Sequence, residues 1–159
     1  DVRTGLCVQT FYGHTNAVND VVFSLRGDAV ASCDADGVVR VWDIRMVSER
    51  ASATLGKVPV HSVAFDRSAA ILTAACDDGS IHVLDAGAGA DATLPVPGKA
   101  SSRVATLKPL AVLRGHTEAV QSLAFDPTST FLASAGNDCT VRLWSEPGVP
   151  LTAAAMGGA

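Results

Sequence analysis

The strongest constraint on the fold is an internal repeat that the chain carries without a gap. Residues 13–42 match residues 115–144 at a constant offset of 102, and 12 of these 30 positions are identical. Each copy opens on Gly-His and ends on a tryptophan, Trp42 in the first and Trp144 in the second. Repetition of this kind indicates stacked supersecondary units, because one unit alone cannot bury its apolar face.

A third, weaker copy lies between these two. An offset of 42 carries Val18 onto Val60 and the pair Asp36-Gly37 onto Asp78-Gly79. The interval to the next copy is longer because a Gly-, Ala- and Pro-rich run is inserted after Asp85. Within each copy, short runs of β-branched and aromatic residues predict strands, and the Asp-Gly pairs predict tight hairpin turns.

The residues at the ends of the copies indicate a family. Gly-His at the start, Trp42-Asp43 at the end and a period near 40 residues resemble the WD-repeat β-propeller. The resemblance implies an all-β fold of four-stranded antiparallel blades around a central channel. Because three blades form only an open arc, we interpret the chain as a partial WD-repeat β-propeller, the C-terminal part of a ring of about seven blades.

This interpretation divides the chain into a strand of a preceding blade, three repeats and a tail, spanning residues 1–12, 13–55, 56–113, 114–145 and 146–159. The second repeat is degenerate and carries the inserted loop at 86–106, which either binds a partner or is a variable flexible loop. The third repeat lacks its last strand, which we expect upstream sequence to supply. The tail is expected to be disordered.

Composition and charge argue against several classes of function. The net charge is −4 and no run of Lys or Arg occurs, so we expect no nucleic-acid binding. No apolar run approaches the length of a membrane span. The four cysteines are widely spaced, which favours reduced thiols over disulfides or a zinc site; they are Cys7, Cys33, Cys76 and Cys139. We expect no metal, no cofactor and no small-molecule substrate.

Two sets of polar residues recur at the offset of 102, and the family resemblance gives them a role. They are His14, Ser32, Asp36 and Trp42 in the first copy and His116, Ser134, Asp138 and Trp144 in the other. In the family this quartet is a buried chain of hydrogen bonds, in which Trp donates to Ser, Ser bonds His, and His bonds the carboxylate. Each bond to a neutral group contributes about 1 kcal/mol net.

The same residue types could suggest a hydrolase. A catalytic triad needs an exposed serine beside an oxyanion hole. Each serine here is predicted to lie inside a strand and bond a tryptophan, and the whole set occurs twice. We therefore expect a structural role and no enzymatic activity.

The middle copy breaks the pattern. Ala74 replaces the serine, Leu84 replaces the tryptophan and Lys57 stands nearest the histidine position. We expect apolar packing to hold this blade and Asp78 to be the more solvated carboxylate. His61 and His82 have no metal-ligand spacing and are interpreted as ordinary strand or surface residues.

Longer runs narrow the resemblance to the family of sperm-associated antigen 16, a WD-repeat component of the ciliary central apparatus. This likeness is carried by the runs Cys7–His14, Ala31–Ala35, Val63–Asp66 and Ile81–Asp85. It implies a non-enzymatic scaffold in the cytoplasm and cytoskeleton, at the axoneme of a motile cilium or flagellum, needed for motility. Its implied partners are other central-apparatus proteins and microtubules at the bridge between the two central microtubules, with possible self-association.

A second interpretation comes from the run Trp42-Asp43-Ile44-Arg45. Together with Asp36 it fits a box found in substrate receptors of cullin-RING ubiquitin ligases, in which Asp43 and Arg45 would contact a partner. The box is short, and Arg45 could instead pair with a nearby surface carboxylate, which is worth up to about 1 kcal/mol. A generic WD-repeat adaptor is the third alternative.

Overall fold

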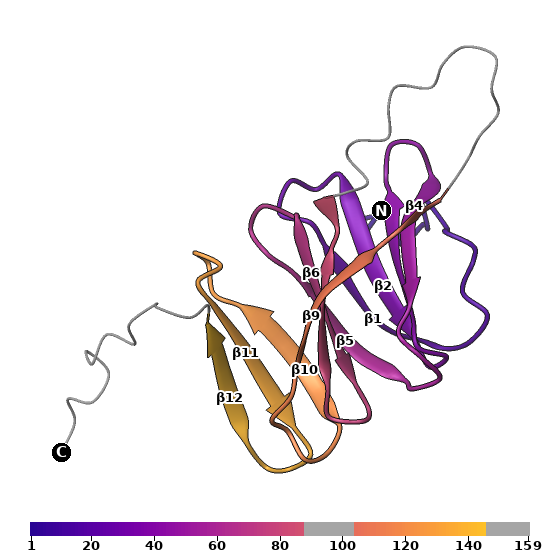
Figure 1. Ribbon diagram of the computed structural model, residues 1–159. Coiled ribbons are helices and arrows are strands. Elements are labelled where there is room, and N and C mark those ends of the chain that lie inside the picture. Colours follow the sequence, from indigo (N-terminus) through magenta and orange to yellow (C-terminus); the bar gives the residue numbers. More distant parts are fainter. Residues whose placement is uncertain (88–103, 146–159) are drawn as a thin grey trace.

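The computed structural model describes residues 1–87 and 104–145, whose strands form three sheets that stand side by side (Figure 1). The first blade contains β1 (Val18–Phe23), β2 (Ala29–Asp34), β3 (Val38–Asp43) and β4 (Ser48–Thr54). The middle blade contains β5 (Val60–Phe65), β6 (Ile71–Cys76), β7 (Ile81–Asp85) and β9 (Lys108–Leu113). The third blade contains β10 (Val120–Phe125), β11 (Phe131–Gly136) and β12 (Val141–Ser145). The predicted all-β fold and partial propeller are confirmed.

The strands named above pair antiparallel with their neighbours in each blade, and the inner strand of the middle blade, β5, lies beside both β1 and β10. Each inner strand pairs with its neighbour through the same register shift, which falls just before Asp20, Ser62 or Ser122. The first two of these side chains link the blades. Ser62 Oγ donates to Asp20 Oδ2 at 2.9 Å and accepts from the backbone N–H of Leu123 at 3.3 Å. The repeat therefore places one polar residue where each blade meets the next.

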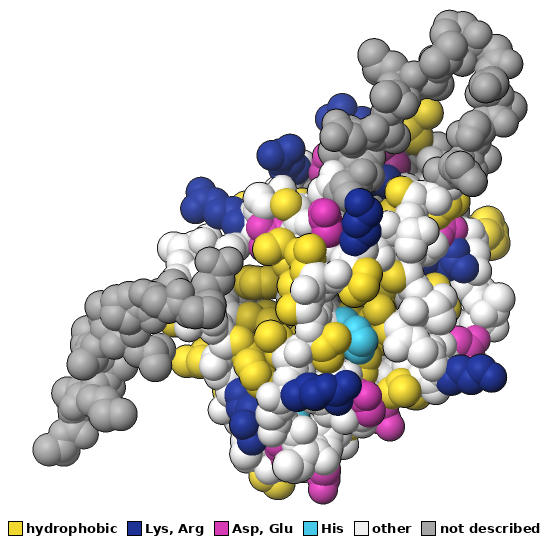
Figure 2. Space-filling model, in the orientation of Figure 1, with side chains coloured by type: hydrophobic (Ala, Val, Ile, Leu, Met, Phe, Trp, Pro, Cys, Tyr) yellow, Lys and Arg dark blue, Asp and Glu magenta, His cyan; other side chains and the backbone are white. Residues whose placement is uncertain are grey.

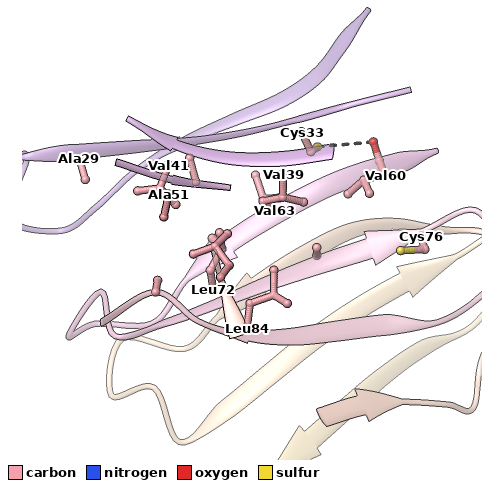
Figure 3. Packing of buried hydrophobic residues seen from close by; sticks show 14 residues of the cluster. Ala29, Cys33, Val39, Val41, Ala51, Val60, Val63, Leu72, Cys76 and Leu84 are labelled. Carbon is pink, nitrogen blue, oxygen red and sulfur yellow. Dashed lines mark hydrogen bonds between the residues drawn. The ribbon is translucent and has the colours of Figure 1, made fainter. Parts of the chain in front are cut away.

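Apolar side chains fill the space between blades. Between the first and middle blades, Val39 and Val41 pack with Val60, Leu72 and Leu84, all of them buried (Figure 3). A smaller cluster of Ile81, Val120, Leu123 and Leu132 joins the middle and third blades. Because burying one such side chain contributes about 1.5–3 kcal/mol, the two clusters supply most of the cohesion of the arc.

The Asp-Gly turns meet the loop of the following blade. Gly37 has a φ of 83°, and a Cβ at this position would lie 2.4 Å from the carbonyl oxygen of Gly56. Gly79 repeats the arrangement against the carbonyl oxygen of His116, at 2.8 Å. The equivalent residue of the third blade is Cys139, which is exposed and has a φ of 59°. Gly37 and Gly79 are thus required, because a side chain at either position would clash with the backbone of the following blade.

The prediction that residues 1–12 form a strand is wrong for the chain as described. No strand precedes Val18, and nearly all of residues 1–12 are exposed. A strand needs a neighbouring strand to bond its backbone groups, and none of the described strands lies beside this segment. Phe11 alone in this segment is partly buried, and the centre of its ring lies 5.5 Å from the centre of the Trp42 ring.

The predicted loop at 86–106 is corrected at its C-terminal end. Residues 105–106 form β8 (Ala105–Thr106), which adds to β4 in parallel and makes the first blade five-stranded. Leu107 follows, almost fully buried in the first apolar cluster, and its N–H donates to the carbonyl of Ser52 at 3.0 Å. The chain thus pairs with β4 of the first blade at residues 105–106 before it enters β9 of the middle blade. The rest of this loop, 88–103, and the predicted disorder of the tail, 146–159, lie outside the described residues.

Candidate functional sites: two histidine networks and the Asp43–Arg45 turn

The third blade contains a continuous chain of side-chain hydrogen bonds made of the four expected residues. Trp144 Nε1 donates to Ser134 Oγ at 2.8 Å, and this oxygen lies 2.7 Å from His116 Nε2. The other ring nitrogen, Nδ1, lies 2.8 Å from Asp138 Oδ2. Burial raises the pKa of Asp138, but hydrogen bonds from the Thr140 hydroxyl and from His116 outweigh it, so the pKa is lowered overall.

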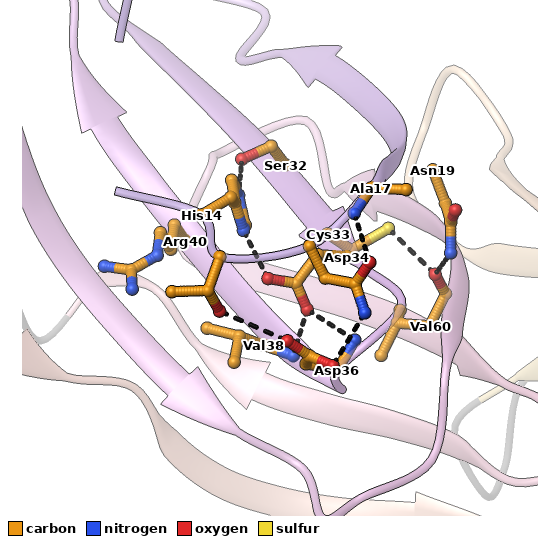
Figure 4. Close-up of polar contacts among 12 residues, drawn as sticks. His14, Ala17, Asn19, Ser32, Cys33, Asp34, Asp36, Val38, Arg40 and Val60 are labelled. Atoms are coloured by element: carbon orange, nitrogen blue, oxygen red, sulfur yellow. Dashed lines mark hydrogen bonds and ion pairs between the residues drawn. The ribbon is translucent and has the colours of Figure 1, made fainter. Parts of the chain in front are cut away.

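The first blade contains the same chain of bonds with a different carboxylate. Trp42 Nε1 donates to Ser32 Oγ at 2.8 Å, and His14 Nε2 lies 2.6 Å from that oxygen. His14 Nδ1 lies 2.6 Å from Asp34 Oδ2, so the prediction that His14 bonds Asp36 is wrong (Figure 4). Asp36 stands exposed at the turn, where Thr15 and Asn16 donate to its carboxylate.

The register of the turn explains the exchange. Asp34 ends β2 and is fully buried, and its Oδ1 accepts the backbone N–H groups of Asp36 and Val38 at 3.0 and 2.9 Å. The residue equivalent to Asp34 in the third blade is Gly136. A Cβ there would lie 2.7 Å from His116 Nδ1, so the third blade must take its carboxylate from Asp138. Asp34, which lies two residues before Asp36 in the sequence, was the signal that could have identified the partner of His14.

Asp34 is held ionised by its partners. Burial alone would raise its pKa, but the N–H of Val38, the ring of His14 and the N–H of Asp36 more than offset that, and the pKa is lowered. The network therefore ties the loop before β1 to the turn between β2 and β3 with a charged acceptor in the centre. Hydrogen bonds to a charged group contribute about 1.5–3 kcal/mol each.

Neither network is built for nucleophilic catalysis. Ser32 and Ser134 are buried, and each hydroxyl oxygen is already engaged by an indole N–H and an imidazole. A triad serine must instead reach a substrate carbonyl beside oxyanion donors. The geometry supports a structural role for both networks.

The middle blade replaces the network with apolar packing. Ala74 and Leu84 are both fully buried in the first apolar cluster. Asp78 is exposed and accepts from the hydroxyl and the N–H of Ser80. It is more solvated than Asp138, as expected, but Asp36 of the first blade is exposed as well. His61 forms a surface pair with Asp77 at 2.7 Å. Lys57, the residue nearest the missing histidine, is exposed.

The Asp43–Arg45 turn separates its two candidate residues. Asp43 Oδ1 accepts the backbone N–H groups of Arg45 and Met46, at 2.9 and 2.8 Å, so this carboxylate shapes the hairpin between β3 and β4. The Arg45 side chain is exposed, and its guanidinium has no ion-pair partner among the described residues. Within residues 1–87 and 104–145 the surface pair that was one interpretation of Arg45 is therefore not formed.

Three further observations concern metal sites, the buried thiols and membrane spans. Within residues 1–87 and 104–145, no group of three or more His, Cys, Asp or Glu side chains is placed to hold a metal ion. Desolvation raises the pKa of Cys33 to about 12 and that of Cys76 to about 11, so both buried thiols stay protonated. In the described part of the chain no helix is long and apolar enough to cross a membrane.

Comparison with known proteins gives a consistent picture. Striatin-4 of Homo sapiens is 30% identical over 84% of this chain and 22% of its own length. Periodic tryptophan protein 2 of Arabidopsis thaliana is 32% identical over 91% of this chain and 14% of its own length. Nuclear distribution protein PAC1 of Arthroderma benhamiae is 29% identical over 91% of this chain and 30% of its own length. The chain thus spans less than a third of each of these relatives.

The family description "WD domain, G-beta repeat" matches residues 5–43, 52–85 and 107–145. Each segment covers the first three strands of one blade, β1–β3, β5–β7 or β10–β12, and begins ahead of the inner strand, so the third segment also takes in β9 of the middle blade. Sequence, strand order and the two histidine networks agree, and the chain belongs to the WD-repeat family.

Proposed function

We propose that the chain is part of a non-enzymatic scaffold that docks other proteins. WD-repeat proteins are generally such scaffolds, and a propeller presents its rims and loops as binding surfaces. The observation that supports a scaffold is the occupancy of both serine–histidine pairs by structural bonds, which leaves neither serine for catalysis. Function on this fold must still be argued from the site.

The more specific proposal is a scaffold of the axoneme of a motile cilium or flagellum, located in the cytoplasm and cytoskeleton. The support is the likeness to the family of sperm-associated antigen 16 over the runs Cys7–His14, Ala31–Ala35, Val63–Asp66 and Ile81–Asp85. The names of the relatives reported above do not mention cilia, so the proposal rests on those runs alone. Its partners would be central-apparatus proteins and microtubules at the bridge between the two central microtubules.

Localisation and interaction together test this proposal. A tagged copy of the protein, expressed in ciliated cells, is expected to lie along the central pair and to co-purify with tubulin and central-apparatus proteins. Cells lacking the protein are expected to have paralysed or poorly beating cilia. A tagged protein spread evenly through the cell body, with normal motility in its absence, would contradict the axonemal role.

The alternative is a substrate receptor of a cullin-RING ubiquitin ligase. Arg45 favours it, because its side chain is exposed and has no ion-pair partner among the described residues, and the receptor box needs an accessible arginine after Trp-Asp. Recovery of the ligase adaptor with the wild-type protein, and its loss in Arg45→Ala, would support a receptor. Arg26→Ala is the matched control, since Arg26 is also exposed and lies in the turn between β1 and β2. Recovery of the same amount of adaptor with Arg45→Ala and with Arg26→Ala would show that Arg45 has no role in binding it.

A further inference from the structure

A cleft with charged walls separates the first blade from the middle blade. It has a volume of about 220 Å³ and lies at the rim where the β1–β2 and β5–β6 turns are, lined by Arg26, Asp28 and Arg50 among others. Lys and Arg side chains are seen along this rim, on the upper side of Figure 2. The blades on both sides of the cleft have at least four strands, so it is bounded within the arc.

A second cleft occupies the equivalent place between the middle and third blades, and its chemistry is different. Leu110, Ile71 and Phe131 line it, and none of the described residues around it is charged. Phe125 lines the second cleft as Phe65 lines the first. The middle and third blades therefore pack without a charge at this place, and the arginines of the first cleft are not needed to pack two blades together.

Arg50 and Leu110 hold the same position in their blades. Arg50 is the residue of β4 that faces no partner on β3, because the register shifts between Val41 and Trp42. Leu110 lies at the equivalent shift between β7 and β9. A bulge of this kind turns its extra side chain out of the regular alternation of the strand, and in both blades that residue lines the cleft to the following blade. The repeat thus fixes where this side chain lies, and only its chemistry differs.

The positive charges of the first cleft are not neutralised by ion pairs. Neither Arg26 nor Arg50 forms an ion pair with any of the residues that the structure describes. Asp28 Oδ1 accepts the hydroxyl of Ser24 at 2.9 Å, and this bond, together with the charges of the two arginines, lowers the pKa of Asp28. Two positive groups and one negative group leave a net charge of +1 in the cleft. One carboxylate would balance it, whereas a phosphate monoester carries about −1.5 to −2.

Small side chains on the middle blade keep this cleft open. Between the middle and third blades, the hydroxyl of Ser129 accepts the backbone N–H of Arg67 at 2.6 Å, which joins the β5–β6 and β10–β11 turns. In the middle blade Ala69 takes the position of Ser129 and has no hydroxyl, so it cannot join the β1–β2 turn in this way. Ala69 and Ala70 line the cleft, and their short side chains leave space in it.

We propose that the cleft binds a Glu or Asp side chain of a partner protein, with the Arg50 guanidinium as the donor to the carboxylate. A guanidinium presents parallel N–H groups that match the two oxygens of a carboxylate. Phe65 and Val41, which also line the cleft, contact the apolar part of the bound segment. The cleft is smaller than the about 300–1,000 Å³ of a typical small-molecule site, which favours a single side chain as its occupant. The site rests on the proposed function, because the partner of the scaffold supplies the carboxylate.

Selection from a library of random peptides tests this site on the intact protein. Peptides that also bind the variant Arg50→Leu are removed first, so that the peptides retained by the wild type depend on Arg50. Leucine is the residue of the middle blade at the same place, and circular dichroism checks that the variant folds. The retained peptides are expected to carry a Glu or Asp beside an apolar residue. No retained peptide, or retained peptides without an acidic residue, would overturn the proposal.

Affinity measurements with one retained peptide locate the contact. Replacing its acid by the corresponding amide should weaken binding by about tenfold to a hundredfold, and so should Arg50→Gln in the protein. The two changes together should weaken binding no more than either alone, because both remove the same contact. Additive losses would place the carboxylate elsewhere and overturn the proposal.

The matched control is Arg67→Ala, which removes the same charge from the β5–β6 turn outside the lining of the cleft. It should change the affinity by less than about twofold, because salt screens charges that are not in contact. A loss equal to that of Arg50→Gln would show a general effect of charge on this rim and contradict a specific site.

A phosphoserine in place of the acid distinguishes the two kinds of anion. It should bind no more tightly than the acidic peptide, because its charge exceeds that of the cleft. Tighter binding would overturn the assignment to a carboxylate. Failure of this site is distinguishable from failure of the proposed function, because localisation and co-purification are measured on the wild-type protein without any peptide.

Discussion

The first and middle blades have the same strand order but are held together differently. In the first, His14 joins Ser32 and Asp34, and Trp42 covers the serine. In the middle blade, Ala74 and Leu84 occupy the serine and tryptophan positions and are fully buried. Both blades share the apolar cluster between them. The comparison teaches that apolar packing is common to the blades, while the network is an addition that a blade can lack.

The network must therefore act on the loops more than on the sheet. It joins the loop before β1 to the turn after β2. In the same region of the middle blade, which lacks the network, the structure has the surface pair of His61 and Asp77 and a backbone hydrogen bond from Asp77 N–H to the carbonyl of Pro59. Buried polar networks stabilise only when every member has its partner, since each orphaned group costs about 1–3 kcal/mol. The substitutions below should thus affect the first and middle blades unequally.

The largest effect is expected from Trp42→Ala. The indole is almost fully buried, so truncation opens a cavity and leaves Ser32 Oγ without its donor. We expect a loss of about 3–5 kcal/mol in the free energy of unfolding, measured by urea denaturation. Trp42→Phe keeps most of the ring and should lose less. A loss under about 1 kcal/mol for Trp42→Ala would mean that the first blade does not depend on its network.

The next effect separates the two carboxylates of the first blade. Asp34→Asn is expected to cost about 2–3 kcal/mol, because the buried carboxylate accepts from His14 and from two backbone N–H groups. Asp36→Asn, its matched control two residues away, should stay within about 0.5 kcal/mol because Asp36 is exposed. The reverse order in denaturation experiments would restore Asp36 as the partner of His14.

Acid should reduce the difference in stability between the wild type and Asp34→Asn. The pKa of Asp34 is lowered in the folded protein, so its contribution is complete above the unfolded-state pKa of about 3.9 and is lost as the pH falls through the lower folded-state pKa. The stability gap between wild type and Asp34→Asn should be full at pH 7 and narrow below about pH 4. Unfolding followed across this range measures it, and a gap that widens in acid would refute the assignment.

The smallest effect is expected in the middle blade. Asp78→Ala removes an exposed carboxylate whose partner is Ser80, two residues away, and should cost about 0.5 kcal/mol. His116→Ala, which orphans Ser134 and Asp138 in the third blade, should cost several times more. Equal shifts in melting temperature for Trp42→Ala, His116→Ala and Asp78→Ala would remove the distinction between the blades.

Much of this fold followed from local pattern. The runs of β-branched and aromatic residues in each copy predicted strands, and the structure has strands there at Val18–Phe23, Val38–Asp43, Val60–Phe65 and Val120–Phe125. Periodic β-branched residues and Asp-Gly turns specify strands locally, and repetition specifies how often the unit recurs. The same alignment also identified the tryptophan, serine and histidine of both networks.

Other features depended on neighbours that are distant in sequence. Residues 6–11 have the composition of a strand but form none, because no described strand lies beside them. Ala105-Thr106 add to β4, a pairing across about 50 residues that no local pattern marks.

The sequence by itself determined that this chain is built from repeated all-β units, and which side chains recur in them. Only the tertiary structure decided which carboxylate each histidine bonds. His14 bonds Asp34, whereas His116 bonds Asp138, whose position in the repeat is two residues further along the turn. It also decided which copies of each apolar face are covered. Periodicity assigns a residue to a face, but burial depends on whether another blade is there to cover it.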